Sequence, residues 1–309
     1  MGTIYAIGEI VFDIIFRDSQ PQQANAGGSM LNSAISLSRT GLAVSFIGET
    51  GNDEVGNTIR VFLNNNHINT NYIQAYTDYK SSIALAFLNE KNDASYVFYK
   101  DYPKQRLTLD LPIPEEGDMV LFGSSFSLHS DVRPILIKLL HTAKEHGATI
   151  MYDPNIRKQS IDKKELKELV LENISMADII RGSDEDFNTI FDTYNENDVY
   201  ESVKANGCNN LIITRNSKDV LLFTPNISHR FEVSPIITKS TIGAGDNFNA
   251  GLIYGLSQRG ISKQELAHCT LHQWQLIIEN GMAFASHVCQ SFDNYISEAF
   301  AEKYSIEKY

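Results

Sequence analysis

Residues 236–248 read Ile236-Ile237-Thr238-Lys239-Ser240-Thr241-Ile242-Gly243-Ala244-Gly245-Asp246-Asn247-Phe248, and this stretch decides the fold. It predicts an apolar strand, then a tight glycine turn, then a helix that continues through Leu256. The glycines let the backbone turn sharply, so the first N–H groups of the helix face a site where a phosphate can bind. Asp246 would repel that anion and therefore indicates chemistry, although a plain turn with an acidic helix start explains the tetrapeptide equally well.

These glycines form neither of two common nucleotide-binding motifs. The string from Gly243 to Phe248 resembles a dinucleotide fingerprint, but Phe248 stands where the third glycine belongs, and the string lies late in the chain. The sequence also contains no G-x-x-x-x-G-K-[ST] string, which excludes a P-loop.

Three segments repeat one order of elements, in which a helix ends at a glycine and a short apolar strand follows. The glycines are Gly41, Gly147 and Gly207, each suited to the left-handed position after a helix. These repeats predict an α/β domain with a parallel sheet covered on both faces. Ligands of such sheets bind beyond the carboxyl ends of the strands.

Two segments depart from this order and predict a small antiparallel sheet that forms a lid. Residues 10–16 continue from the first strand, and residues 83–88 and 96–100 alternate on either side of a turn at 90–93, as in a hairpin.

We therefore predict one domain over residues 1–309, with lid segments inserted at about 10–28 and 83–106. The remainder after the glycine turn is predicted to be helical, with an amphipathic region over 264–288 and a short helix near the C-terminus.

The composition excludes several classes of protein. A net charge of -12 argues against a nucleic-acid partner, and no apolar run is long enough to predict a membrane span. The start of the chain, residues 1–9, has no basic region and predicts a first strand and no signal peptide. Cys208, Cys269 and Cys289 are far apart and odd in number, so we expect reduced thiols and a cytoplasmic protein.

Further polar clusters lie where this fold would place the ends of strands. Gly27 and Gly28 allow a ligand to approach the backbone, and Asn32 lies one turn into the next helix. Asp13 follows the first strand, where a carboxylate can accept two sugar hydroxyls. Each of these features taken alone is more often structural.

Two more clusters follow buried strands. Asp153-Pro154-Asn155-Ile156-Arg157 brings a carboxylate, an amide and a guanidinium to the carboxyl edge of the sheet. Arg181-Gly182-Ser183-Asp184-Glu185-Asp186-Phe187 places three acids at a helix start, where they suit either hydrated Mg²⁺ or the helix dipole.

Taken in order, these motifs resemble the PfkB/ribokinase family of carbohydrate kinases, from about residue 4 to residue 290. The resemblance implies a three-layer α/β/α ribokinase-like domain with a mostly parallel sheet and a small antiparallel β lid. It also implies transfer of the γ-phosphoryl group of ATP, with Mg²⁺, to a sugar hydroxyl. The part most similar to the fructokinase branch is Gly8-Glu9 with Asp13, together with Asp153-Pro154-Asn155.

The resemblance further implies roles for individual residues. Asp246 would take the hydroxyl proton as the base, and the amides of Gly243, Ala244 and Gly245 would form an anion hole with it. The residues implied on the sugar side are Asp13, Gly27, Gly28, Asn32, Asn155 and Arg157. Those implied on the nucleotide side are Ser183, Asp186, Thr214, Arg215 and Asn216, with Asp186 as a water-mediated Mg²⁺ ligand.

The chain departs from the family on the nucleotide side. Ser240 stands where the family has an aspartate that helps to bind a monovalent cation, which puts activation by K⁺ in doubt. The T-x-G-x-x-G turn has no glycine here, so Asn216 or Asp219 must adopt left-handed geometry, or the nucleotide must lie differently. The other departures are Ser183–Asp186 in place of the N-x-x-E motif and Val288–Asp293 in place of a glycine-containing turn near adenine.

The leading hypothesis is an ATP- and Mg²⁺-dependent sugar kinase acting on a ketohexose such as fructose. Two alternatives stay open: a sugar-binding protein of kinase ancestry with little catalysis, and a nucleoside kinase on the same scaffold. An exposed edge of the lid sheet would favour a homodimer that pairs through the lid.

Overall fold

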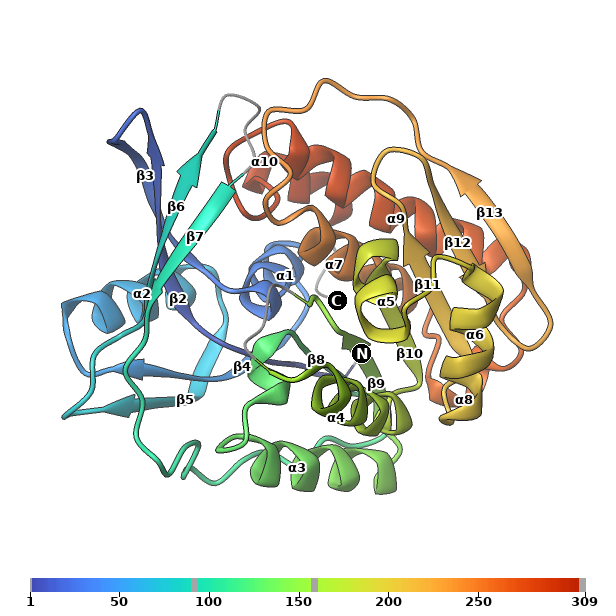
Figure 1. Ribbon diagram of the computed structural model, residues 1–309, viewed down its shortest axis with the longest axis horizontal. Coiled ribbons are helices and arrows are strands. Elements are labelled where there is room, and N and C mark those ends of the chain that lie inside the picture. The colour runs from blue at the N-terminus through green and yellow to red at the C-terminus, as the bar shows by residue number, and fades with distance from the viewer. Residues whose placement is uncertain (1, 90–93, 157–160, 306–309) are drawn as a thin grey trace.

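The computed structural model of the chain describes residues 2–89, 94–156 and 161–305. Within them, a nine-stranded sheet A and a four-stranded sheet B form the frame (Figure 1). Sheet A has the order β13-β12-β11-β10-β9-β8-β1-β4-β5 and is parallel from β11 to β5. Its strands are β1 Ile4–Ile7, β4 Val44–Gly51, β5 Asn69–Tyr76, β8 Met119–Gly123, β9 Thr149–Asp153, β10 Ile179–Ser183, β11 Asn210–Thr214, β12 Asp219–Phe223 and β13 Ser228–Glu232.

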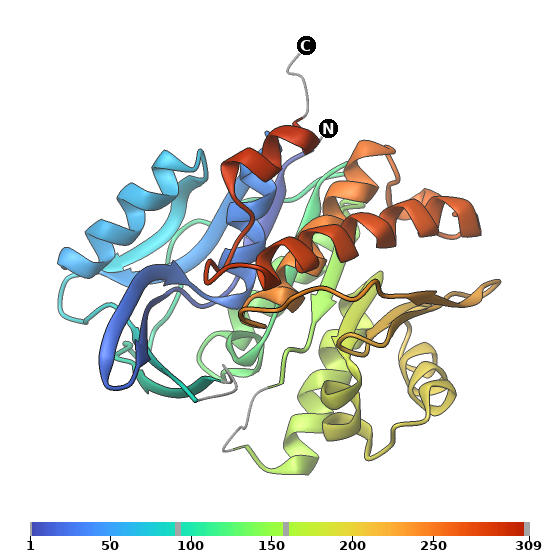
Figure 2. The ribbon, with the colours of Figure 1, turned by 90° about the horizontal axis from the view of Figure 1, so that it is seen from above.

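Helices cover both faces of sheet A, because its central strands are apolar on both sides. In β8, Met119 and Leu121 pack into one core cluster, while Val120 and Phe122 pack into the other. Figure 2 shows α9 and the helices α4 to α6 on opposite sides of the sheet. On the side of α9 lie α1 Ser29–Arg39, α2 Glu54–Asn65, α7 Ala244–Gln258, α8 Lys263–Leu266, α9 Leu271–Cys289, α10 Glu298–Ala301 and the 3₁₀ turn Glu302–Tyr304. On the other lie the 3₁₀ turn Ser125–Leu128, α3 Arg133–Glu145, α4 Lys163–Met176, α5 Asp184–Phe191 and α6 Glu196–Ala205.

The three predicted helix–glycine–strand units are present. Gly41, Gly147 and Gly207 have φ values of 88°, 84° and 98°, in the left-handed region that a side chain would disfavour. Each glycine ends a helix and is followed by a strand of sheet A. The expected three-layer α/β/α fold with a mostly parallel sheet is therefore confirmed.

Sheet B forms the predicted lid and has the order β3-β2-β6-β7. Its one parallel pair is β2 with β6, and the other two pairs, including the expected hairpin of β6 and β7, are antiparallel. The turn predicted at 90–93 lies outside the described residues. The strands are β2 Val11–Arg17, β3 Gln20–Gly27, β6 Ile83–Leu88 and β7 Ala94–Tyr99, within the two predicted lid segments.

The apolar strand predicted just before the glycine turn is wrong. After β13 ends at Glu232, residues 233–240 form no strand, and Ile237 is 89% exposed. Within the described residues, this segment pairs with no strand of sheet A or sheet B. It is fixed by hydrogen bonds that Lys239 N and Ser240 N donate to Cys289 O, at 2.8 and 3.3 Å. The helix itself begins at Ala244 and continues through Leu256, as predicted.

The region predicted to be helical over 264–288 is interrupted by a new helix start. Helix α8 ends at Leu266, and α9 begins at Leu271 behind a capping box, in which the Thr270 hydroxyl accepts a hydrogen bond from Gln273 N. A capping box satisfies N–H groups that a helix start leaves open, so it favours a break at this point. Among the described residues, no helix has the length and apolarity that a membrane crossing requires.

Candidate active site

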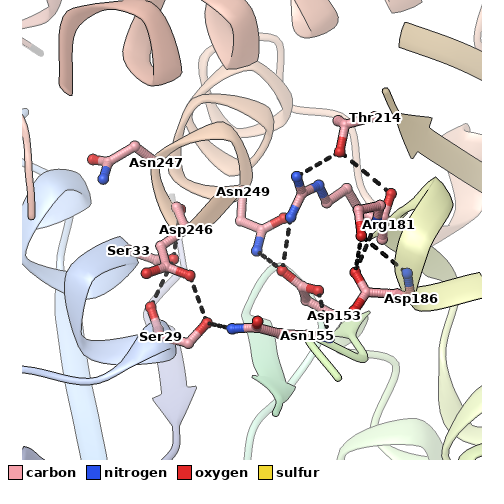
Figure 3. Close-up of polar contacts among 12 residues, drawn as sticks. Ser29, Ser33, Asp153, Asn155, Arg181, Asp186, Thr214, Asp246, Asn247 and Asn249 are labelled. Carbon is pink, nitrogen blue, oxygen red and sulfur yellow. Dashed lines mark hydrogen bonds and ion pairs between the residues drawn. The ribbon is translucent and has the colours of Figure 1, made fainter. Parts of the chain in front are cut away.

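Asp246 lies in the first turn of α7, and its carboxylate is held from α1. Asp246 Oδ1 accepts a hydrogen bond from Ser29 Oγ at 2.6 Å (Figure 3). Its Oδ2 accepts one from Asn32 Nδ2 at 2.8 Å. The backbone carbonyl of Asp246 accepts a third bond from Ser33 Oγ at 2.7 Å. The carboxylate is therefore buried and fixed in orientation by two facing helices.

The turn that leads into α7 depends on Gly243. Gly243 has φ 75°, and a Cβ built on it would lie 2.7 Å from the carbonyl oxygen of Asn294. Asn247 ties this turn down, because its Nδ2 donates to Gly243 O and to Asn294 O, each at 2.8 Å. Ala244 N donates to Thr241 O at 3.2 Å, whereas helix geometry leaves the next N–H groups of α7 without intrahelical partners, so the turn suits an anion.

A small cavity of about 180 Å³ opens on the Asp246 side of this turn. It lies between α1, the α7 turn and the inner face of sheet B, and Lys100 at its edge forms a 2.7 Å ion pair with Glu9. Its lining residues are Glu9, Val11, Asp13, Gly28, Ser29, Asn32, Tyr96, Phe98, Lys100, Ser124, Ser125, Asn155, Ile242 and Asp246. Carboxylates, amides and hydroxyls on a small cavity suit a compact polyhydroxyl ligand.

The predicted sugar-side glycines make room for neighbouring polar groups. A Cβ on Gly27 would lie 2.0 Å from Asp13 Oδ2, and one on Gly28, where φ is 130°, would lie 2.1 Å from Glu9 O. Asp13 is thus held close to the start of α1, and its Oδ2 accepts a hydrogen bond from Asn294 Nδ2 at 3.1 Å. Gly28 lines the cavity. Gly27 does not line it and packs against the Asp13 carboxylate.

Asn155 reaches the same cavity from the end of β9. Its side-chain amide donates to Ser29 Oγ at 2.7 Å, which links it to Asp246 through the serine hydroxyl. Its φ of 38° and the hydrogen bond from Asn155 N to Asp153 Oδ1 at 3.1 Å fix this turn. Arg157, the last residue predicted on the sugar side, lies outside the described residues.

A much larger cavity, of about 1420 Å³, opens on the other side of the α7 turn. Ala244 and Gly245 line it, so one short turn contributes to both cavities. The predicted nucleotide-side residues that line it are Ser183, Asp186, Thr214 and Asn216.

The nucleotide turn without glycine adopts the geometry that its sequence requires. Asn216 has φ 51°, in the left-handed region that asparagine tolerates better than most residues. Arg215 makes a two-bond contact with Asp219, with both distances 2.6 Å, and this contact lowers the pKa of the Asp219 carboxyl. The guanidinium of Arg215 is therefore already paired with a carboxylate.

The acidic helix start at Ser183 is a capping box. Asp186 Oδ2 accepts from Ser183 N and Ser183 Oγ, while Oδ1 accepts from Ile156 N at 2.7 Å. Within the described ranges, no three or more His, Cys, Asp or Glu side chains gather in a possible metal site. Glu185 and Asp186 nevertheless line the large cavity. Magnesium at Asp186 stays a prediction.

Sequence reasoning gave no role to Arg181 or Asn249, which lie in a buried cluster with Asp153 and Thr214 beneath the turn. Asp153 Oδ2 accepts from Arg181 Nη1 at 3.1 Å and from Asn249 Nδ2 at 2.5 Å, and Arg181 Nη2 donates to Thr214 Oγ1 at 2.7 Å. Burial raises the pKa of the Asp153 carboxyl to about 6, against the lowering effect of Arg181. The sequence feature that could have indicated this cluster is Arg181, a charged residue directly after the apolar pair Ile179-Ile180.

Ser240, at the position connected with a monovalent cation, is buried beside the turn. Its hydroxyl accepts a hydrogen bond from Ile242 N at 3.2 Å. A neutral hydroxyl that caps its own turn brings no negative charge to this place, unlike a carboxylate.

Comparison with known proteins gives a consistent result. The family model described as pfkB family carbohydrate kinase matches residues 1–295. The chain is 26% identical over 267 residues to a fructokinase of Escherichia coli, covering 85% of this chain and 87% of that one.

Two solved structures have the same fold. Aminoimidazole riboside kinase from Salmonella enterica, complexed with aminoimidazole riboside and an ATP analog, is 20% identical with a TM-score of 0.84, over 98% of both chains. A double mutant of fructokinase from Vibrio cholerae O395, in a form that binds fructose, ADP and potassium ion, is 19% identical with a TM-score of 0.85, over 99% of both chains.

Proposed function

The chain belongs to the pfkB family of carbohydrate kinases, and on this premise we propose that it transfers the γ-phosphoryl group of ATP to a hydroxyl of a ketohexose such as fructose. One observation carries the proposal: Asp246 lines the small cavity, while Ala244 and Gly245 of the same turn line the large one. A base and a set of anion-binding amides thus face two neighbouring ligand sites, which is the arrangement that phosphoryl transfer needs.

In the proposed reaction, a sugar hydroxyl in the small cavity gives its proton to Asp246. Its oxygen forms a bond to the γ-phosphorus as the bond from that phosphorus to the β,γ-bridging oxygen breaks, which leaves ADP. Ser29 and Asn32 hold the carboxylate in place during this step, since each donates to one of its oxygens. The N–H groups at the start of α7 stabilise the charge on the phosphoryl oxygens.

We propose that Mg²⁺ enters with the nucleotide. Magnesium in such sites is commonly bound by phosphates and one or two carboxylates, and Glu185 and Asp186 line the large cavity. When bound, it would neutralise charge on the phosphate oxygens.

A second candidate substrate is a riboside with a flat base, such as the one bound by the Salmonella enterica kinase. Tyr96 and Phe98 of the lid line the small cavity, with rings 5.7 Å apart and an interplanar angle of 11°. Stacked rings of this kind suit a planar heterocycle as well as the apolar face of a sugar.

A coupled assay of ADP release across a panel of hexoses and ribosides, with ATP and Mg²⁺, tests the proposal. We expect release with a ketohexose, and preference for a riboside would establish the second candidate. Calorimetric binding of a sugar without ADP release from any compound would overturn the kinase proposal and favour a sugar-binding protein.

We also propose that the chain forms a homodimer through the lid. Phe87, Val97 and Tyr99 lie on the face of sheet B opposite the cavity, and Tyr99 is 61% exposed. Exposed apolar side chains gathered on one sheet face are typical of an interface. Analytical ultracentrifugation should give a dimer for the native chain and a monomer for Val97→Lys, and a monomeric native chain would contradict the proposal.

A further inference from the structure

Arg181 lies beneath the turn of α7 and is almost fully buried. It is part of β10, and only 7% of the residue is exposed. Figure 3 shows its guanidinium between Asp153 and Thr214, to which Nη1 and Nη2 donate at 3.1 and 2.7 Å. A positive charge is thus held in a fixed place next to the candidate anion site.

The guanidinium lies against the glycine turn itself. A Cβ built on Gly245 would be 3.1 Å from Arg181 Nη2 and 2.7 Å from Nη1, and the second distance is shorter than real Cβ contacts. On the same helix, the Phe248 ring centroid is 5.4 Å from the guanidinium carbon. Gly245 therefore leaves space for a cation at the point where α7 begins.

The hydrogen bonds of Arg181 are incomplete in the part of the chain that the structure describes. Its Nε is buried and has no hydrogen-bond partner there, although Arg181 lines the large cavity. A buried guanidinium with an unsatisfied donor is costly unless a further acceptor arrives. Asp153 supplies only one acceptor oxygen to it and shares that oxygen with Asn249.

We propose that Arg181 is a fixed cation that binds the transferring phosphoryl group at the start of α7. The inference rests on the phosphoryl transfer proposed for the same turn. As the sugar oxygen bonds to the γ-phosphorus and the bond to the bridging oxygen breaks, the hydroxyl proton goes to Asp246. Arg181 keeps its own protons and stabilises the equatorial oxygens by its charge.

The test compares Arg181→Met with Arg133→Met. Arg133 is similarly buried, at 8% exposure, and donates to Ser127 O, Asn173 and Glu172, but it lines neither cavity. We expect Arg181→Met to lower kcat by about 10²-fold to 10³-fold, the usual effect of removing one transition-state donor. Arg133→Met should lower thermal stability comparably and leave kcat within about twofold of the native value.

A binding measurement separates phosphate contact from a purely structural role. By calorimetry, Arg181→Met should weaken binding of a non-hydrolysable ATP analogue about tenfold, as expected from the loss of one charged hydrogen bond, while ADP binds as in the native chain. Arg181→Gln keeps hydrogen-bonding groups without the charge, and serves the same purpose if the methionine variant does not fold.

Three outcomes would overturn the inference. The first is that kcat falls equally in Arg181→Met and Arg133→Met. The second is that Arg181→Met weakens the binding of ADP and of the ATP analogue equally. The third is that a folded Arg181→Gln binds the analogue with native affinity. In each case the native chain would still release ADP, so the proposed function would stand. A native chain that releases no ADP with any sugar would overturn both.

Discussion

The two sides of the α7 turn are built differently. On the proposed sugar side, side chains face a cavity of about 180 Å³, and Asp246 and Asn155 are linked by hydrogen bonds through Ser29. On the proposed nucleotide side, the cavity is about 1420 Å³, and Arg215 is paired with Asp219. Side-chain hydrogen bonds hold Asp246 on the small side, whereas for the large side we propose that ligand binding depends on the N–H groups of the turn and on Arg181.

This difference indicates where specificity and rate arise. A small cavity with fixed donors and acceptors discriminates among ligands, because a misplaced hydroxyl leaves a buried polar group unpaired. A wide cavity binds a long ligand by a few strong contacts, chiefly at its charged end. We therefore expect substitutions on the two sides to change different kinetic constants.

The largest effect is expected at Asp246, where the two sides meet. Asp246→Asn removes the proposed base and puts a side chain of nearly the same size between Ser29 and Asn32. kcat should fall by about 10²-fold to 10⁴-fold while sugar affinity is largely kept, because a general base acts in the transition state. Steady-state kinetics and calorimetry measure the two quantities.

The matched control for this substitution is Asp198→Asn. Asp198 is exposed on α6 and lines neither cavity, so its substitution should leave kcat unchanged. A decrease in kcat of less than tenfold in Asp246→Asn would show that another group takes the proton.

The sequence was sufficient to predict most of the fold, because its strongest signals are local. The glycines after three helices predicted three helix–glycine–strand units, and each glycine has the required positive φ. The strand expected before Gly243 failed for a non-local reason. Ile236 and Ile237 are apolar enough for a strand, but within the described residues their segment pairs with no strand of either sheet.

The position of a candidate site residue could be predicted where a local sequence motif marks it. Asp246 follows a recognisable glycine turn, so its position was visible in the sequence. Arg181 was not, since its meaning depends on contacts with Asp153, Thr214 and Gly245, which come from three other parts of the chain. No local pattern encodes such a contact.

Asp153 connects the two sides, and its ionisation should appear in the stability of the protein. Its Oδ1 accepts from Asn155 N and its Oδ2 from Arg181. Its pKa is raised from 3.8 to about 6, chiefly by burial, so the folded state holds a proton that the unfolded state releases between these values. Stability should therefore fall as pH rises from about 4 to about 6, by about 3 kcal/mol in total.

Urea unfolding of the native chain and of Asp153→Asn between pH 3 and pH 7 isolates this contribution. The difference in unfolding free energy between the two should fall with increasing pH in that window. A difference that is constant with pH would mean that Asp153 titrates at its ordinary value, and that the two sides are not coupled through a protonated carboxyl.

A smaller effect is expected at Asn216, on the nucleotide side alone. Asn216→Ala places an alanine at φ 51° and should cost about 1 kcal/mol of stability, whereas Asn216→Gly should be close to neutral. Because Asn216 lines the large cavity, the alanine variant should also raise KM for ATP but not for the sugar. The control is His67→Ala, at φ 59° and lining neither cavity, which should lose similar stability without changing KM. A change in the sugar KM of Asn216→Ala would contradict the expectation that the two sides act on different kinetic constants.

The smallest expected effect concerns monovalent cations. Ser240 brings no charge to the turn, and Arg181 already supplies a positive group at Gly245. Rates in K⁺ and in a bulky organic cation at equal ionic strength should therefore agree within about twofold, since a covalently held charge needs no ion from solution. Ser240→Asp sharpens the comparison, because a carboxylate there should attract a cation and make the rate sensitive to K⁺. Clear stimulation of the native chain by K⁺ would show instead that the nucleotide side keeps an ion site like that of the potassium-bound Vibrio cholerae fructokinase.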